Sequence, residues 1–400
     1  MPYGDSPRDM PAPARVLFLK QTAPPRTYFI EMATDLAEAL GPCEALTSET
    51  PPGSFGSLTV LRGPAYHRSS DISRLWAWGR YFVEALRVSF RTSRQTLLFI
   101  VAQPPLLPLI GYLRSLLFRQ RYVVWVDDVY PDVLVRAGRL REDSAVAKVW
   151  GWLNKRVYGR ASAVFTLGPC MAGLVQRYTA RPVHVVPTWV DADGFPDVRK
   201  EENPFAREHG QVGKLTVLYS GNIGLTHDIE TMFAAARRLE DRQDIGFTVV
   251  GAGPRYEEAR RAARGLDNVT VLPLQPQEML PFSLATGEVA VVSLGKGFEG
   301  VSMPSKTYHS MAARSAILGL SHAPNDLQGV IEQTDCGVNI EPGDVDGFVE
   351  AVLRFKDDAA YLDRCRRNSR AAAETRFSRR TNVERVLEII RPLLPSDGHA

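Results

Sequence analysis

The chain has 400 residues, of which 44% are hydrophobic and 23% charged, and its formal net charge is +3 at pH 7. This length suits two domains, and the composition is that of a globular protein. No apolar run reaches the roughly 18 residues of a spanning helix, so we expect none. The four cysteines form no CxxC pair and have no histidine at ligand spacing, which argues against a zinc site or a disulfide framework.

Charge is unevenly divided along the chain. Residues 1–200 contain 25 lysines and arginines against 17 acidic residues, whereas the remainder contains 23 against 28. A basic first half indicates an anionic partner. No nucleic-acid-binding motif accompanies this charge, so we expect no nucleic acid among the partners.

The first half alternates between strand-like and helix-like segments. Residues 1–14 are polar and proline-rich without an apolar segment, and we expect a disordered lead-in. Apolar runs predict strands at 15–19, 58–61, 96–102, 121–126, 162–167 and 183–186. Helical periodicity predicts helices at 28–40, 71–94, 144–158 and 169–178, with another ending near residue 118. This alternation is typical of a doubly wound parallel sheet.

A polar stretch rich in proline, glycine and aspartate, residues 188–213, breaks the pattern and predicts a linker. The second half then restarts it. Predicted strands are 215–220, 245–250, 269–272, 288–294, 316–320 and 337–340, and predicted helices include 227–239, 277–285, 359–370 and 381–394. The predicted fold class is therefore α/β, with two Rossmann-like doubly wound parallel-sheet domains, 15–187 and 214–380, facing a cleft. The helix at 381–394 is expected to pack back on the first domain.

The segment 295–313, GKGFEGVSMPSKTYHSMAA, follows a buried strand and opens a helix. Pro304 suits the first helical turn, and a helix N-terminus at the end of a strand favours phosphate. Lys306 would add a full positive charge there, and Glu299 is a lone carboxylate in the loop. Taken alone, the segment is better interpreted as an ordinary strand-loop-helix connection with a solvated lysine, and the functional interpretation depends on the rest of the chain.

Two further glycine loops follow strands of the second half. One contains Gly221, Asn222 and Gly224, with His227 close behind, and the other contains Gly251 and Gly253. Glycines let backbone N–H groups approach a phosphate closely. His227 is either a phosphate donor or a side chain exposed on the first helical turn. The 251–253 loop lacks the third glycine of a dinucleotide-binding motif.

Four stretches together resemble the family-4 retaining glycosyltransferases of the GT-B fold. They are 187–191 (PTWVD), 219–230 (YSGNIGLTHDIE), 249–254 (VVGAGP) and 298–306 (FEGVSMPSK). The resemblance implies that the C-terminal domain binds a nucleotide-diphosphate sugar, with UDP as the expected nucleotide, and that the N-terminal domain binds the acceptor. It also implies metal-independent transfer, with no cofactor beyond the donor substrate.

The sequence departs from this family pattern at two places. Asn222 and His227 stand where the family often carries arginine and lysine to hold the diphosphate. Glu299 matches the first of two family glutamates, but Thr307 occupies the second position. The Met-Pro-Ser-Lys form is similar to a subgroup of surface-polysaccharide assembly, in which Ser305, Lys306 and Thr307 would lie at the donor phosphates.

The resemblance implies roles for three residues. Lys306 would neutralise the leaving nucleotide diphosphate, and Glu299 would lie beside the donor sugar. Asp128, in the segment DDVYPD at 127–132, would orient or deprotonate the acceptor hydroxyl. Capping of the following helix is the alternative for Asp128.

Segments 73–94 and 106–121 mix aromatic residues with arginines. Such helices either lie on an anionic membrane, which would suit a polyprenyl-diphosphate-linked acceptor, or face the core with a solvated arginine side. We expect a cytoplasmic enzyme, peripheral at the inner face of the plasma membrane, that acts on a glycan or lipid-linked acceptor. A nucleotide-sugar 2-epimerase and a catalytically silent nucleotide-sugar-binding protein are the alternatives.

Overall fold

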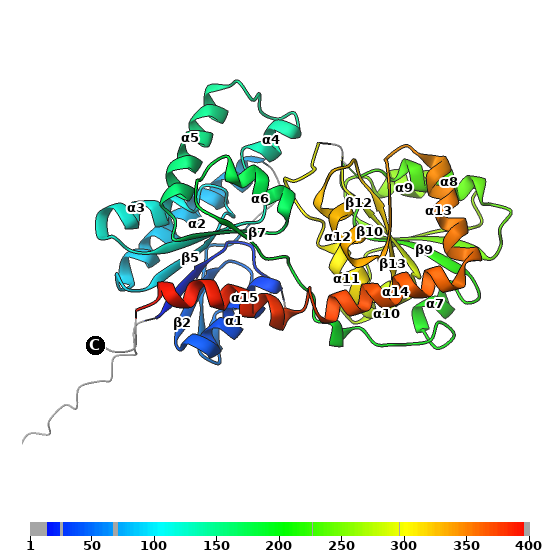
Figure 1. The fold of residues 1–400 in the computed structure, drawn as a ribbon, viewed down its shortest axis with the longest axis horizontal. Coiled ribbons are helices and arrows are strands. Elements are labelled where there is room, and N and C mark those ends of the chain that lie inside the picture. The colour runs from blue at the N-terminus through cyan, green and yellow to red at the C-terminus, as the bar shows by residue number, and fades with distance from the viewer. Residues whose placement is uncertain (1–13, 25–26, 67–70, 226, 296, 396–400) are drawn as a thin grey trace, which may run out of the picture.

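The computed structural model describes residues 14–24, 27–66, 71–225, 227–295 and 297–395. Most of the predicted lead-in therefore lies outside the described residues. Figure 1 shows two lobes, each built around one sheet, with the C-terminal helix returning to the first lobe. The expected α/β architecture of two parallel-sheet domains is confirmed.

The first sheet has eight strands in the order β3-β4-β2-β1-β5-β6-β7-β8, and every pair is parallel except β3 with β4. Its strands are β1 (Val16–Leu19), β2 (Cys43–Thr47), β3 (Gly53–Phe55), β4 (Leu58–Arg62), β5 (Leu97–Val101), β6 (Tyr122–Val126), β7 (Ala163–Thr166) and β8 (Val183–Val185). Its helices are α1 (Tyr28–Leu40), α2 (Asp71–Arg91), α3 (Leu109–Phe118), α4 (Asp132–Arg136), α5 (Ala145–Arg160) and α6 (Pro169–Gln176).

The second sheet has six parallel strands in the order β11-β10-β9-β12-β13-β14. They are β9 (Leu215–Asn222), β10 (Ile245–Ala252), β11 (Val269–Pro273), β12 (Val289–Ser293), β13 (Ala316–Leu320) and β14 (Gly337–Ile340). The helices are α7 (Pro204–Glu208), α8 (Glu230–Arg238), α9 (Tyr256–Ala262), α10 (Leu280–Ala285), α11 (Lys306–Ala312), α12 (Asp326–Thr334), α13 (Val345–Asp357), α14 (Ala359–Glu374) and α15 (Arg379–Ile390). Three 3-10 turns complete the list: η1 (Ala192–Gly194), η2 (Gln277–Met279) and η3 (Arg391–Leu393).

Strand burial explains why the central strands are uniformly apolar. Helices cover both faces of each sheet, so residues pointing either way are removed from water. In the first sheet Phe99, Trp125 and Phe165, from β5, β6 and β7, pack their rings at centroid distances of 5.6 to 6.0 Å. All three side chains are fully buried. This aromatic row supports the carboxyl ends of the strands that carry Asp127 and Asp128.

The helices of the first domain form two layers (Figure 1). Helices α1 and α15 lie on one side of the sheet, and α2, α3 and α5 lie on the other. Right-handed crossovers account for this division, because the chain runs in opposite directions along the sheet before and after the connection from β4 to β5. Helix α15 packs against α1, and Arg379 donates to both carboxylate oxygens of Asp35, at 2.7 and 2.6 Å.

The two domains also meet through a buried carboxylate. Asp326, in the first turn of α12, accepts hydrogen bonds from the backbone N–H groups of Cys170 (2.7 Å) and Met171 (3.1 Å) in α6. It therefore caps a helix of the other domain. Gly168 permits this approach, because a Cβ atom built there would lie 2.3 Å from the carboxylate carbon of Asp326.

No helix in the described part of the chain is long and apolar enough to cross a bilayer.

The Asp326 contact generates a stability prediction. Replacement Asp326→Ala should lower the unfolding free energy by about 1–2 kcal/mol, since two N–H groups at the α6 N-terminus lose their acceptor. Thermal melting monitored by circular dichroism measures the effect. Glu332→Ala, which removes an exposed acid from the same helix, is the control and should leave the melting temperature within about one degree of wild type. Equal melting of the two variants would contradict the role given to Asp326.

Candidate functional site

The carboxyl ends of the two sheets meet at the domain boundary. The backbone N–H of Val129, just after β6, donates to the carbonyl of Val301, after β12, at 3.2 Å. In parallel sheets ligands bind beyond the carboxyl ends of the strands. The predicted residues Asp128 and Glu299 therefore lie in loops of different domains that touch each other.

Lys306 is the first residue of α11 and is half-buried. Its Nζ donates to the hydroxyl of Tyr219 at 2.9 Å and lies 4.0 Å from the centroid of that ring. Removal of the amine from water lowers the pKa of Lys306 to about 7. No carboxylate among the described residues pairs with it. A cation so placed gains from any anion that reaches it.

His227 completes a cluster with these two residues. Its Nδ1 lies 2.7 Å from the Tyr219 hydroxyl, and the carbonyl of Asn222 accepts a hydrogen bond from that hydroxyl at 2.8 Å. Burial, followed by the charge of Lys306, lowers the pKa of His227 to about 4, so the ring is neutral at pH 7. The expectation of a helix starting at His227 is wrong, because α8 begins at Glu230 and His227 stays in the preceding loop.

The two glycine loops at the ends of β9 and β10 pack on each other. A Cβ atom at Gly251 would lie 1.9 Å from the carbonyl oxygen of Gly221, and one at Gly253 would lie 2.6 Å from that of Ile223. Gly221 and Gly253 adopt positive φ angles of 119° and 138°. Close packing thus requires glycine at positions 251 and 253. At Gly224 an added Cβ would lie 3.3 Å from the Asn222 amide nitrogen.

Glu299 is held in its loop by both domains. Its Oε1 accepts from the backbone N–H of Gly297 at 3.0 Å. Arg136, from α4 of the first domain, lies 3.8 Å from Oε2 and donates to the carbonyl oxygens of Gly297 (3.1 Å) and Glu299. Arg136 therefore fixes the backbone and the carboxylate of this loop together.

The residues around Lys306 differ in their availability. Ser305 is exposed immediately before α11, whereas Thr307 is fully buried and its hydroxyl donates to the carbonyl of Pro304 at 2.8 Å. The hydroxyl of Thr307 is thus already engaged in a hydrogen bond within its own helical turn. Pro304 precedes the helix instead of occupying its first turn, because α11 starts two residues later.

The two aspartates that follow β6 have different surroundings. Asp127 accepts from Lys20 Nζ (2.6 Å), the Tyr28 hydroxyl (2.6 Å) and Trp125 Nε1 (2.9 Å), so its oxygens are occupied. Burial, followed by the neighbouring charge of Asp127, raises the pKa of Asp128 to about 6. Asp128 does not cap the next helix: α4 begins at Asp132, after Pro131, without a side-chain cap. Its carboxylate is thus suited to proton transfer near neutral pH.

Sequence reasoning missed Tyr219 and Arg136. Tyr219 lies in a run of apolar strand residues, so the sequence gives no sign of its role. That role is visible only in the contacts of its hydroxyl with Asn222, His227 and Lys306. Arg136 lies in a short helix that no periodicity marks, and its partners are 161 and 163 residues away in sequence. The segment DDVYPD, which places α4 directly after the acceptor aspartates, was the only local signal.

Comparisons with known proteins agree with this geometry. Residues 214–358 match the family model described as Glycosyl transferases group 1. A Pseudomonas aeruginosa protein named probable glycosyltransferase WbjE is 27% identical over 363 residues, which is 86% of this chain and 88% of that protein. WcaI of Escherichia coli K12, whose name refers to colanic acid biosynthesis and glycosyl transfer, is 26% identical over 74% of this chain and 76% of its own length.

Solved structures show the same architecture. Sucrose-phosphate synthase from Thermosynechococcus elongatus has a TM-score of 0.74 at 17% identity, covering 95% of this chain and 99% of its own. HepE of Anabaena, in complex with UDP-glucose, has a TM-score of 0.70 at 12% identity, covering 94% of this chain and 99% of its own. The described fold, the matched domain and the curated relatives together identify the chain as a glycosyltransferase of the GT-B fold.

Proposed function

We propose that the protein transfers a sugar from UDP to a glycan or polyprenyl-diphosphate-linked acceptor with retention of configuration, as a family-4 enzyme of surface-polysaccharide assembly. The observation that carries the proposal is Lys306, a half-buried amine that has a lowered pKa and no carboxylate partner among the described residues. The structure of HepE with UDP-glucose and the colanic-acid name of WcaI support the donor and the pathway class.

The donor diphosphate would lie between α11 and the loop after β9. Lys306 and Ser305 would contact it from α11, and the backbone around Gly221, Asn222 and Gly224 would contact it from the other side. His227, being neutral, would donate a hydrogen bond without adding charge. As the bond from the anomeric carbon to the diphosphate breaks, negative charge develops on the leaving oxygen, and a preorganised ammonium stabilises it.

Glu299 and Asp128 would act on the sugar and on the acceptor, respectively. Glu299 would accept hydrogen bonds from the donor sugar and stabilise positive charge at its anomeric carbon. The acceptor oxygen would attack from the face that the diphosphate leaves, so that one C–O bond forms as the other breaks. The acceptor proton would pass to the leaving phosphate or to Asp128, whose raised pKa suits it to receive one.

Positive charge in this scheme comes from side chains, and transfer would need no metal ion or further cofactor. In this proposal the ammonium of Lys306 takes the part that a divalent cation takes in other diphosphate chemistry.

Two substitutions test the assignment. Lys306→Ala should lower kcat/KM by about 100-fold to 1000-fold and weaken UDP binding, since it removes the charge opposite the diphosphate. Glu299→Ala should lower turnover by about tenfold or more with little change in UDP affinity. Turnover with UDP-sugars and isothermal titration with UDP measure both effects. Lys214→Ala, at the opposite end of β9, is the matched control.

Three results would contradict the assignment. Turnover at the wild-type level in Glu299→Ala would show that Glu299 has no part in catalysis. Binding of a UDP-sugar without transfer to any acceptor would favour a catalytically silent binding protein. Epimerised nucleotide sugar among the products would favour the 2-epimerase.

The lowered pKa of Lys306 predicts pH-dependent donor binding. Below pH about 7 the amine is protonated in the free enzyme, and the affinity for UDP-glucose should be constant. Above that value binding must recapture a proton, so the affinity should fall by up to about tenfold per pH unit. Calorimetric titration across this range measures the break. Lys306→Arg, which stays charged throughout, should show no break near pH 7; a break that persists there would assign it to another group.

Arg136 is proposed as a positioning residue of the same site. Arg136→Met should lower kcat by about tenfold while changing the Kd for UDP-glucose less than about threefold, because the loop carrying Glu299 loses its support from the first domain. Steady-state kinetics and calorimetry separate the two quantities. Arg139→Met, at an exposed neighbouring position, should behave as wild type. A large loss of donor affinity with unchanged kcat would contradict the positioning role.

A further inference from the structure

Helices α2, α3 and α5 form one continuous outer layer on the first domain, on the side of the sheet opposite α1 and α15 (Figure 1). Phe90 of α2 packs edge-to-face on Phe118 of α3 at a centroid distance of 5.7 Å. Arg160 of α5 donates to the Ser115 hydroxyl of α3 at 2.7 Å. Because each helix is joined to the next, their outward sides make one surface, here called the outer helical surface.

This surface exposes large apolar side chains. Those of α2 lie at positions 72, 75, 76, 83 and 90, spacings that place them on one side of the helix, while Ala77, Tyr81 and Ala85 of the same helix are buried toward the sheet. Helix α2 thus has a second apolar stripe that faces outward. The exposed members on the three helices are Ile72, Leu75, Trp76, Val83, Phe90, Leu113, Leu116, Leu117, Val146, Val149 and Trp152. A cluster of this size on a monomer marks an interaction site.

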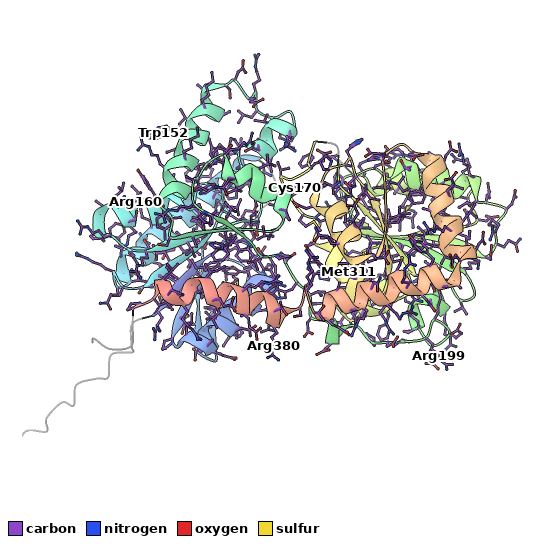
Figure 2. The ribbon with its side chains drawn as sticks, viewed as in Figure 1. Trp152, Arg160, Cys170, Arg199, Met311 and Arg380 are labelled. Carbon is purple, nitrogen blue, oxygen red and sulfur yellow. The ribbon has the colours of Figure 1, made fainter. Side chains whose placement is uncertain are left out.

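The charge of the surface is predominantly positive. The three helices contain nine lysines and arginines, of which Arg114 is buried, and two acidic residues, both of them in α2. On α5 the guanidinium of Arg156 lies 5.4 Å from the ring centroid of Trp152, whose exposed fraction is 54%. Figure 2 labels Trp152 on α5, on the side away from the second domain. Apolar groups and cations thus alternate on one face.

A shallow hollow of about 680 Å³ opens on α2 within this surface. Leu75, Trp76 and Val83 provide its apolar lining. Arg80, Glu84 and Arg87 also line it, and Glu84 pairs with Arg87 at 2.8 Å, which leaves Arg80 as the cation without that partner. Gly79 leaves the floor open, since an added Cβ there would meet nothing within 4 Å. Trp76 has an exposed fraction of 68%. The hollow therefore pairs an apolar surface with guanidinium groups, as a lipid chain and its anionic headgroup require.

The outer helical surface borders the proposed acceptor site. Trp150 of α5 stacks on Tyr130 at a centroid distance of 5.8 Å and an interplanar angle of 13°. Tyr130 lies two residues beyond Asp128, and its N–H donates to the Asp128 carbonyl at 3.1 Å. Helix α5 therefore connects the outer helical surface to the loop that carries Asp128.

We propose that the outer helical surface docks on an anionic lipid bilayer, with α2 and α5 lying in the headgroup region. The alternation of tryptophan, aliphatic side chains and arginine is typical of helices that lie in a membrane interface, and each cation near an anionic surface adds to the attraction. Docking there brings a lipid-linked acceptor to Asp128, and this purpose rests on the proposed function. The docking itself is independent of donor chemistry.

Vesicle flotation tests the proposal with the full chain. The protein should float with vesicles of phosphatidylcholine and phosphatidylglycerol, and far less with phosphatidylcholine alone. Added salt should weaken the binding through screening. The variant Trp76→Ser/Trp152→Ser should lower partitioning by about tenfold or more. Leu274→Ser, which removes an apolar side chain with an exposed fraction of 66% from the second domain, is the control and should float as wild type does.

Charge is tested separately from apolar contact. Arg80→Gln/Arg156→Gln should reduce binding to anionic vesicles several-fold, whereas Arg264→Gln, an exposed arginine of the second domain, should not. Absence of flotation by the wild type, or equal flotation of every variant, would overturn the proposal. Light scattering that shows a dimer for the wild type and a monomer for the tryptophan variant would also overturn it, since a second copy of the chain would then cover the surface.

UDP-glucose binding distinguishes this inference from the proposed function. The tryptophan and arginine variants should bind UDP-glucose as wild type does, because their side chains lie on the first domain, away from Lys306. Normal donor binding without flotation would reject the membrane surface alone. Flotation without donor binding by the wild type would reject the proposed donor site alone.

Discussion

The proposed function depends on one interaction, that of the Lys306 ammonium with Tyr219, in which the described part of the chain supplies no carboxylate partner. Lys306 is held against the ring and hydroxyl of Tyr219, whose position is set by a buried strand. Withdrawal from water without a carboxylate partner costs free energy, and the lowered pKa expresses that cost. Binding of an anion recovers it. On the proposed function, the second domain is thus prepared for a diphosphate before one arrives.

In the first domain the corresponding group is an acid, Asp128, whose pKa is raised by burial and by the charge of its neighbour Asp127. Lys20, Tyr28 and Trp125 occupy the oxygens of Asp127, and that charge helps to keep Asp128 protonated up to a higher pH. Contact between the loops after β6 and β12 then places these two environments side by side. In the proposed reaction the second domain supplies a cation for the diphosphate and the first domain supplies a weak acid for the acceptor.

Local sequence predicted most of the strand and helix alternation and the loop containing Lys306. Buried strands appear as short apolar runs and helix starts as capping or proline residues, so both can be recognised within a few residues. It did not predict β2, whose sequence CEALT lacks a continuous apolar run, nor the exposed hairpin strand β3. The roles of Tyr219 and Arg136 were equally hidden, since each is defined by partners from distant segments. Thr307 is buried because of the way α11 packs, and the position of a residue in the sequence motif does not reveal which side of the helix faces the core.

The return of α15 to the first domain has a mechanical consequence. The chain passes from one domain to the other after β8 and passes back before Arg379, whose guanidinium is fastened to Asp35. Two covalent crossings, unlike one, resist twisting of the lobes about a single tether. Rotation of the lobes would therefore be limited to an axis that runs through both crossings, and on the proposed function such a rotation would bring the two substrates together along one path.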